Sequence, residues 1–137
     1  MKRSVLALIA GLALWVVVVS LLNRGLRVGF TGYAVAEPTM TFTLGMKVAR
    51  LIIGAVASLA AGAATGMMAR SKTGPPWVLG AILLLAFIPV HIGLWTKFPL
   101  WYHLTFLGTL VPLVALGARL TRSRAGDLQA PTASQLS

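Results

Sequence analysis

The chain has 137 residues, of which 58% are hydrophobic and only 10% are charged. Soluble domains usually carry about 25% charged residues, so this composition excludes an ordinary soluble protein. The 12 Lys and Arg residues against 2 Asp and Glu give a net charge of +10. These positive charges are sparse and lie between long apolar runs, which favours a membrane protein and excludes a nucleic-acid partner. The absence of Cys excludes disulfides, thiolate metal sites and cysteine catalysis.

Four apolar runs follow one another along the chain and predict membrane spans at residues 5–22, 47–69, 77–96 and 99–119. Each run is long enough for one transmembrane helix, because about 20 apolar residues cross the ~30 Å hydrocarbon core. None of them shows the two-residue alternation that is typical of an outer-membrane strand. We therefore predict an all-α, polytopic membrane protein, a bundle of four transmembrane helices that forms one domain over residues 1–120.

The two ends of the chain lead to further expectations. Lys2 and Arg3 precede the first apolar run as they would in a signal peptide. That run is longer than the usual hydrophobic region of about 7–15 residues in such a peptide, so we expect it to remain as a helix. Residues 121–137 are polar and small and include a proline, so we expect a disordered cytoplasmic tail.

The orientation follows from the positive charges near the ends of the spans. Four spans place both termini on the same side of the lipid bilayer. With both termini in the cytoplasm, seven of the 12 Lys and Arg residues lie on the cytoplasmic side and five on the other. The positive-inside rule favours this arrangement, so we predict cytoplasmic N- and C-termini in an inner (plasma) membrane.

A stripe of small residues runs along the second predicted span, at intervals of four: Gly54, Ser58, Gly62 and Gly66. Small side chains at this spacing let two helix backbones approach closely, and dispersion then holds the helices together. The pattern favours packing within the bundle over contact with a second copy or another membrane protein, although it is compatible with each of these partners.

Four residues predict a polar pocket near the non-cytoplasmic surface of the membrane: Arg50, His91, His103 and Tyr102. Counting along the helices places all four at a similar depth. Ionisable groups within a span tend to face protein or water, and Arg50 would attract an anionic headgroup or water. The alternative, in which each side chain reaches the membrane surface independently, is favoured over a shared pocket.

Catalytic, metal and cofactor sites are not expected. A zinc site needs three or four ligands, and only Glu37 could assist the two histidines. On neighbouring helices, His91 and His103 would lie too close together to hold a haem between them. No Ser–His–Asp set can be assembled, and there is no glycine-rich nucleotide loop after a strand. We therefore predict no catalytic residues, no metal ligands and no cofactor.

Three segments resemble a known group of proteins: EPTMTFTLGMKVARL at residues 37–51, PVHIGLW at 89–95 and KFPLWYHLTFLGTLVPLVALGARL at 97–120. They are similar to segments of an uncharacterised family of small, four-span bacterial inner-membrane proteins. The resemblance implies a location in the bacterial inner membrane. It implies no activity and no functional residues, because none is known for that family.

The leading functional hypothesis is a non-enzymatic, multi-pass inner-membrane protein that acts as an accessory or interaction subunit. A second hypothesis is a small homo-oligomeric transporter or channel, with a pore lined by Arg50 and threonines. A third is a redox or quinone-linked membrane protein that uses His91 and His103. The chain does not match small multidrug exporters, because its first span lacks the buried acid that proton coupling requires.

Overall fold

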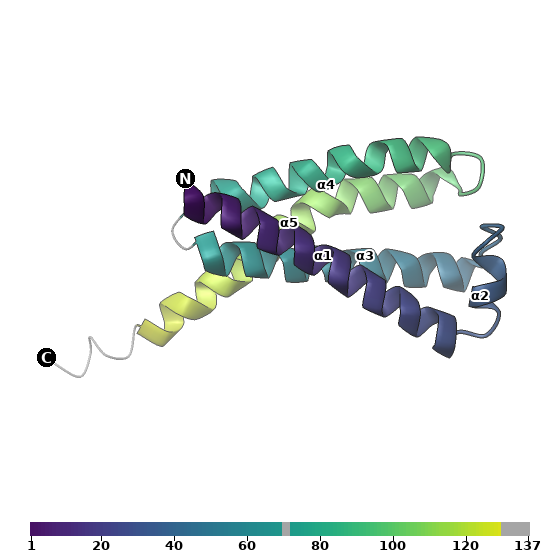
Figure 1. The fold of residues 1–137 in the computed structure, drawn as a ribbon, viewed down its shortest axis with the longest axis horizontal. Coiled ribbons are helices and arrows are strands. Elements are labelled where there is room, and N and C mark those ends of the chain that lie inside the picture. Colours follow the sequence, from purple (N-terminus) through teal and green to yellow (C-terminus); the bar gives the residue numbers. More distant parts are fainter. Residues whose placement is uncertain (70–71, 130–137) are drawn as a thin grey trace, which may run out of the picture.

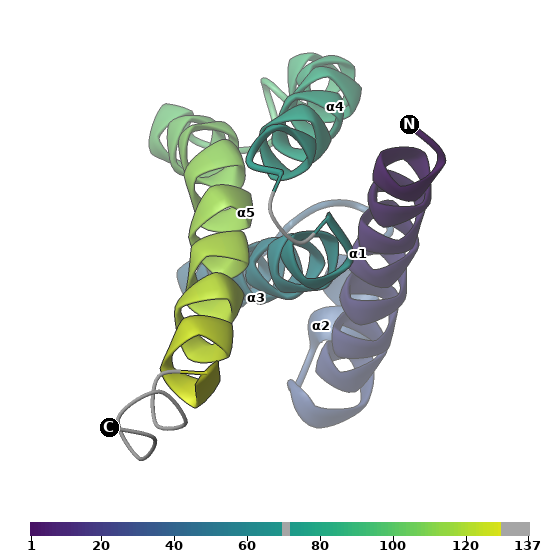
Figure 2. The same cartoon turned by 90° about the vertical axis from the view of Figure 1, so that its left-hand side faces the viewer.

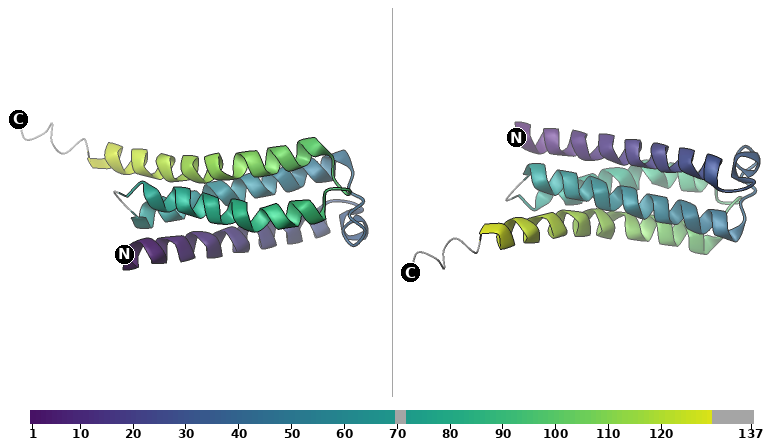
Figure 3. Two further views of the ribbon diagram at one scale, coloured as in Figure 1. Left: turned by 90° about the horizontal axis from the view of Figure 1, so that it is seen from above. Right: turned by 90° about the horizontal axis from the view of Figure 1, so that it is seen from below.

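The computed structural model describes residues 1–69 and 72–129. Within these residues, four long helices form an elongated bundle, and a short helix at Tyr33–Ala36 lies at one end of it (Figure 1). In chain order the helices are α1 (Lys2–Gly29), α2 (Tyr33–Ala36), α3 (Leu44–Ala69), α4 (Gly74–Gly93) and α5 (Leu100–Gln129). The start of α1 and the end of α5 lie at one end of the bundle, and α2 lies at the other, here called the α2 end (Figure 3).

All four long helices are long and apolar enough to cross a membrane. In a bilayer the backbone must satisfy its own hydrogen bonds, which makes helices the stable form for these apolar runs. The predicted fold class, an all-α bundle of four candidate membrane spans, is confirmed.

The helix bounds differ from the predicted spans because a helix does not end where the hydrocarbon ends. The first helix continues through two arginines to Gly29, well beyond residue 22. The third long helix begins three residues earlier than residue 77, with Pro75 and Pro76 in its first turn. Proline is tolerated there because the first N–H groups of a helix have no acceptor within it.

The prediction of a disordered tail from residue 121 is wrong for its first part. The last helix extends to Gln129, and residues 130–137 lie outside the described residues. Arg122 Nη2 donates a hydrogen bond to the Lys72 carbonyl at 2.7 Å, which joins this helix to the α3–α4 turn. Once a helix has formed, each added residue costs little, so good helix formers such as Arg, Ala and Leu extend it.

The α3 helix lies at the centre of the bundle, between α1 and α5, and α4 packs mainly on α5 (Figure 2). The central core is formed by buried side chains from all four long helices: Trp15, Ala57, Ala61, Leu79, Leu83, Leu110 and Val114. A second buried cluster, at the α2 end, contains Tyr33, Ala36, Phe42, Met46, Phe98 and Tyr102. Gly32 permits the turn into α2, since its φ of 80° is left-handed.

The small-residue stripe of α3 packs within the chain, mainly against α5. A Cβ atom on Gly62 would collide with the Val114 carbonyl, and one on Gly66 would lie 2.8 Å from the Ala118 Cα. Gly54 faces the Phe106 ring, with 2.8 Å between its ideal Cβ position and the ring. The backbone contacts at Gly62 and Gly66 leave no room for a side chain, so the structure contains the intramolecular packing favoured from the sequence.

Ser58 differs from the three glycines, because it faces α1. Its Oγ accepts a hydrogen bond of 3.2 Å from Trp15 Nε1 and donates one of 2.7 Å to the Gly54 carbonyl. The stripe therefore contacts two neighbouring helices. Two other glycines, which the sequence analysis did not select, provide the matching close contacts: Gly117 of α5 against Leu59, and Gly11 of α1 against Thr65.

Candidate functional site

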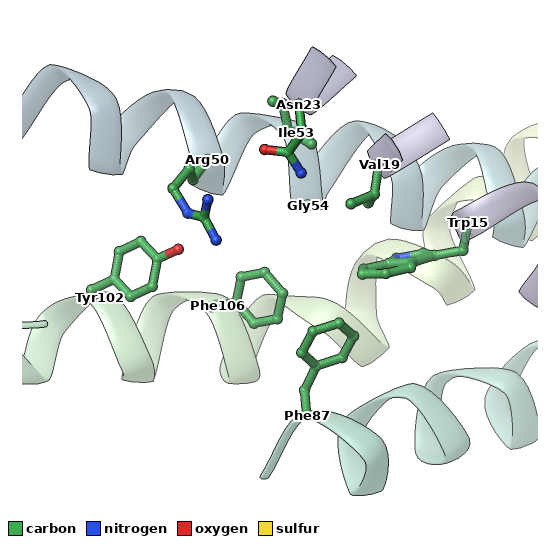
Figure 4. Close-up of a pocket in the computed structure, with 9 residues that line it drawn as sticks. All are labelled: Trp15, Val19, Asn23, Arg50, Ile53, Gly54, Phe87, Tyr102 and Phe106. Atoms are coloured by element: carbon green, nitrogen blue, oxygen red, sulfur yellow. The ribbon is translucent and has the colours of Figure 1, made fainter. Parts of the chain in front are cut away.

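A cavity of about 110 Å³ lies between the four long helices. Every long helix contributes to its wall, as Figure 4 shows. The lining residues are Trp15, Val19 and Asn23 from α1; Arg50, Ile53 and Gly54 from α3; Phe87 from α4; and Tyr102 and Phe106 from α5. The cavity thus exists only in the assembled bundle.

Arg50 is the charged group of this cavity. Its Nη1 donates a hydrogen bond of 2.7 Å to the Tyr33 hydroxyl, and its guanidinium lies 4.9 Å from the centre of the Phe42 ring. The hydroxyl of Tyr102 points toward the guanidinium (Figure 4). The Nε atom of Arg50 is buried and has no hydrogen-bond partner in the described residues. A guanidinium has five N–H donors, so this one retains donor capacity in its cavity.

A wider groove of about 670 Å³ adjoins the cavity and shares Val19, Asn23 and Arg50 with it. Three arginines and one carboxylate line the groove: Arg24, Arg27, Arg50 and Glu37. Arg27 Nε lies 2.6 Å from Glu37 Oε2, so this carboxylate pairs with α1 and not with Arg50. The groove therefore has a net positive charge.

The opposite part of the cavity is aromatic. The Trp15 and Phe87 rings have centroids 4.9 Å apart, and those of Phe87 and Phe106 are 5.2 Å apart. The hydrogen bond from Trp15 to Ser58 holds the indole in place, because the hydrocarbon offers it no other partner. The cavity thus has a polar side at Arg50 and an apolar side at these three rings.

The two histidines do not line this cavity. His91 of α4 and His103 of α5 are both buried, and their Nδ1 atoms lie 2.7 Å apart, within hydrogen-bond distance. The Trp95 ring stacks on His103 at 5.0 Å, and the Phe106 ring lies 4.8 Å from His91. No macrocycle fits between two nitrogen atoms at this distance.

The structure therefore corrects the expected pocket of four residues. It places Arg50 and Tyr102 in the cavity, and it pairs His91 with His103 beside it. Tyr102 connects the two features, since its ring lies 6.0 Å from each imidazole. Independent extension of the four side chains to the membrane surface is also not observed, because Arg50 bonds to Tyr33 and both histidines are buried.

Several cavity residues were not found from the sequence. Trp15, Phe87 and Phe106 lie in three different apolar runs, where an aromatic residue is ordinary. Their meeting depends on how each helix is rotated about its axis, and no local pattern determines that rotation. Asn23 is the exception, since a polar amide at the end of an apolar run could have been selected.

The histidine pair predicts a measurable coupling between α4 and α5. Replacing either His91 or His103 with leucine should leave the other imidazole buried without its partner, which costs free energy. Replacing both should destabilise the protein by about 0.5–1.5 kcal/mol less than the sum of the single effects. Unfolding in mixed micelles would measure each variant.

A matched control for the histidine cycle is Thr109→Val. Thr109 is exposed, and its hydroxyl bonds only to carbonyls of its own helix. We expect little change in stability from this substitution. Strictly additive effects of the two histidine substitutions would show that the 2.7 Å contact does not join the helices.

Comparison of the chain with protein-family models, with curated proteins and with solved structures finds no match. The resemblance of residues 37–51 and 89–120 to small bacterial inner-membrane proteins thus stays a prediction.

Proposed function

We propose that this chain is a non-enzymatic, multi-pass protein of the bacterial inner membrane that binds an anionic ligand at Arg50. The supporting observation is the position of Arg50, which is half-buried at the cavity and whose Nε atom has no partner among residues 1–69 and 72–129. Charged groups within membrane helices are costly to bury and mark binding sites or ion pathways. The nearest carboxylate of the groove, Glu37, pairs with Arg27 and leaves Arg50 for a ligand.

The polar groups beside Arg50 are suited to holding an anion. Tyr33 accepts the hydrogen bond from Arg50 and donates one of 3.3 Å to Asn23 Oδ1. This arrangement leaves the amide N–H groups of Asn23 as further donors in the cavity that it lines together with Arg50. Charge-assisted hydrogen bonds from arginine to phosphate or carboxylate are the strongest that such a site can form. The site offers hydrogen-bond donors for recognising an anion, which supports a binding role.

Ligand binding at Arg50 has a direct test. We expect inorganic phosphate or phosphatidylglycerol, added to the purified full chain in a neutral detergent, to raise the melting temperature. Arg50→Gln should abolish this rise, because the neutral amide cannot make charge-assisted bonds. The ligand-induced shift is compared with the ligand-free melting temperature of the same variant.

Lys97→Gln is the matched control for Arg50→Gln. Lys97 is exposed, follows α4 and lies outside both the cavity and the groove, so its loss removes one positive charge without touching the site. Its ligand-induced shift should equal that of the wild type. Equal shifts in Arg50→Gln and in the wild type would refute the proposed function.

The proposed orientation in the membrane places both termini in the cytoplasm. Its support is the excess of positive charge at the end that carries the termini and the α3–α4 turn. A reporter enzyme that works only in the cytoplasm should be active when it is fused after Ser137. A reporter that works only outside the cytoplasm should be active when it is inserted near Gly32. The reverse pattern would show that both termini lie outside the cytoplasm. A mature chain that begins within residues 30–40 would show that the first helix is cleaved off.

A further inference from the structure

We infer that the anionic ligand is an amphiphile, with its charged head at Arg50 and its apolar part against the aromatic side of the cavity. The inference rests on the proposed function and assigns the chemical class of the ligand. Phosphate and carboxylate heads both satisfy the guanidinium. The apolar side of the cavity favours a lipid-like molecule over a free anion as the ligand.

The polarity of the cavity changes along the bundle axis on three helices in the same direction. On α1, Asn23 lies near the α2 end, and Val19 and Trp15 follow at intervals of four residues toward the bundle centre. At 1.5 Å per residue, Trp15 lies ~12 Å deeper than Asn23. This side of α1 is therefore polar at the membrane surface and apolar in the hydrocarbon.

The other two helices repeat this order. On α3, Arg50 is followed one turn deeper by Gly54, and on α5 Tyr102 is followed one turn deeper by Phe106. Figure 4 shows Arg50 and Tyr102 at one end of the cavity, with Phe106, Phe87 and Trp15 toward the other. An inserted lipid has the same order, with a charged head at the surface and a chain directed inward.

The charge of the site favours an anionic head over a zwitterionic one. The adjoining groove brings Arg24, Arg27 and Arg50 together with one carboxylate, Glu37. Of the three arginines, Arg27 pairs with that carboxylate. A zwitterionic head would bring its own positive charge close to Arg24 and Arg50, and like charges repel at this short range.

The cavity also provides room for the apolar part. Its volume of about 110 Å³ can take the first few carbon atoms of a chain between Val19 and the aromatic rings. A free phosphate would contact only the polar side of the cavity. Aromatic rings and Val19 instead match the hydrocarbon of an amphiphile.

Tryptophan quenching can test this inference in the full chain. Trp77→Phe, Trp95→Phe and Trp101→Phe together leave Trp15 as the single tryptophan. This protein is placed in phosphatidylcholine bilayers that contain lipid with brominated chains, either phosphatidylglycerol or phosphatidylcholine. We expect the brominated phosphatidylglycerol to quench Trp15 with about fivefold higher apparent affinity. Circular dichroism verifies that each variant is folded.

Two substitutions locate the effect. Arg50→Gln should abolish the preference for brominated phosphatidylglycerol, whereas the matched Lys97→Gln should retain it. Val19→Phe should weaken quenching by filling the apolar side, while the stabilisation by inorganic phosphate in detergent remains. The results for Arg50→Gln and Lys97→Gln would locate the head of the ligand at Arg50. The result for Val19→Phe would locate its chain on the apolar side of the cavity.

The outcomes separate this inference from the proposed function. Equal quenching by the two brominated lipids, together with stabilisation by inorganic phosphate that requires Arg50, would overturn the amphiphile and retain an anion site. Equal quenching together with no Arg50-dependent stabilisation by any anion would overturn both. If Arg50→Gln keeps the same preference for brominated phosphatidylglycerol as the wild type, the lipid binds elsewhere on the surface, and the inference is overturned.

Discussion

Replacing Gly62 with leucine should destabilise the bundle by at least about 3 kcal/mol, because the α3 and α5 backbones are in contact at this position. Even a Cβ atom there would collide with the Val114 carbonyl, so the helices must separate. Between helices in lipid, loss of close packing is not compensated by a hydrophobic driving force. Unfolding by denaturing detergent, together with particle size in mild detergent, would measure the effect.

The control for Gly62→Leu is Gly108→Leu on α5. Gly108 is exposed and has no atoms within 4 Å of its ideal Cβ position. Leucine there should be neutral or stabilise the helix by up to ~1 kcal/mol, since glycine is a poor helix former. If Gly62→Leu were as stable as the wild type, the close contact would not exist. A loss of particle size without a loss of stability would show a contact between two copies.

Replacing Gly11 with leucine should have the second-largest effect, also about 3 kcal/mol, by separating α1 from α3. A Cβ atom at Gly11 would collide with the Thr65 hydroxyl and lie 2.7 Å from Leu79 Cδ2. The same displacement would disturb the hydrogen bond from Thr65 Oγ1 to the Ala7 carbonyl at 3.3 Å. Unfolding by denaturing detergent is again the measurement.

Gly25→Leu is the matched control on the same helix, because no atom lies within 4 Å of its ideal Cβ position. Its stability should be close to that of the wild type. In a background where Trp15 is the single tryptophan, its fluorescence provides a second measurement, since separation of α1 should remove the indole from Phe87 and Ser58. Unchanged stability and fluorescence in Gly11→Leu would contradict the α1–α3 contact.

The small-residue stripe shows how far a local pattern predicts packing. Gly62 and Gly66 could be recognised because close helix contact in lipid requires small residues at this interval. The pattern did not reveal that Ser58 contacts α1 while its neighbours contact α5. That division depends on the crossing of three helices, which places two partners around one helix.

The candidate site shows the same limit. Arg50 and Tyr102 could be assigned to a common depth, since depth follows from counting residues along a helix. The separation of His91 and His103 from the cavity could not be predicted, because counting gives the height of a side chain and not its direction around the axis. The two imidazoles face each other between α4 and α5, with their Nδ1 atoms 2.7 Å apart.

The sequence by itself determined the fold class and the four apolar helices, because membrane insertion depends on the length and hydropathy of each run, which are local properties. It also determined at which positions small residues allow two helix backbones to approach closely. Only the tertiary structure decided where α1 and α5 end, which glycines oppose one another, and that Trp15, Phe87 and Phe106 share a cavity with Arg50. Those features depend on the rotation and crossing of helices, which are set by the sum of many weak contacts between residues distant in the chain.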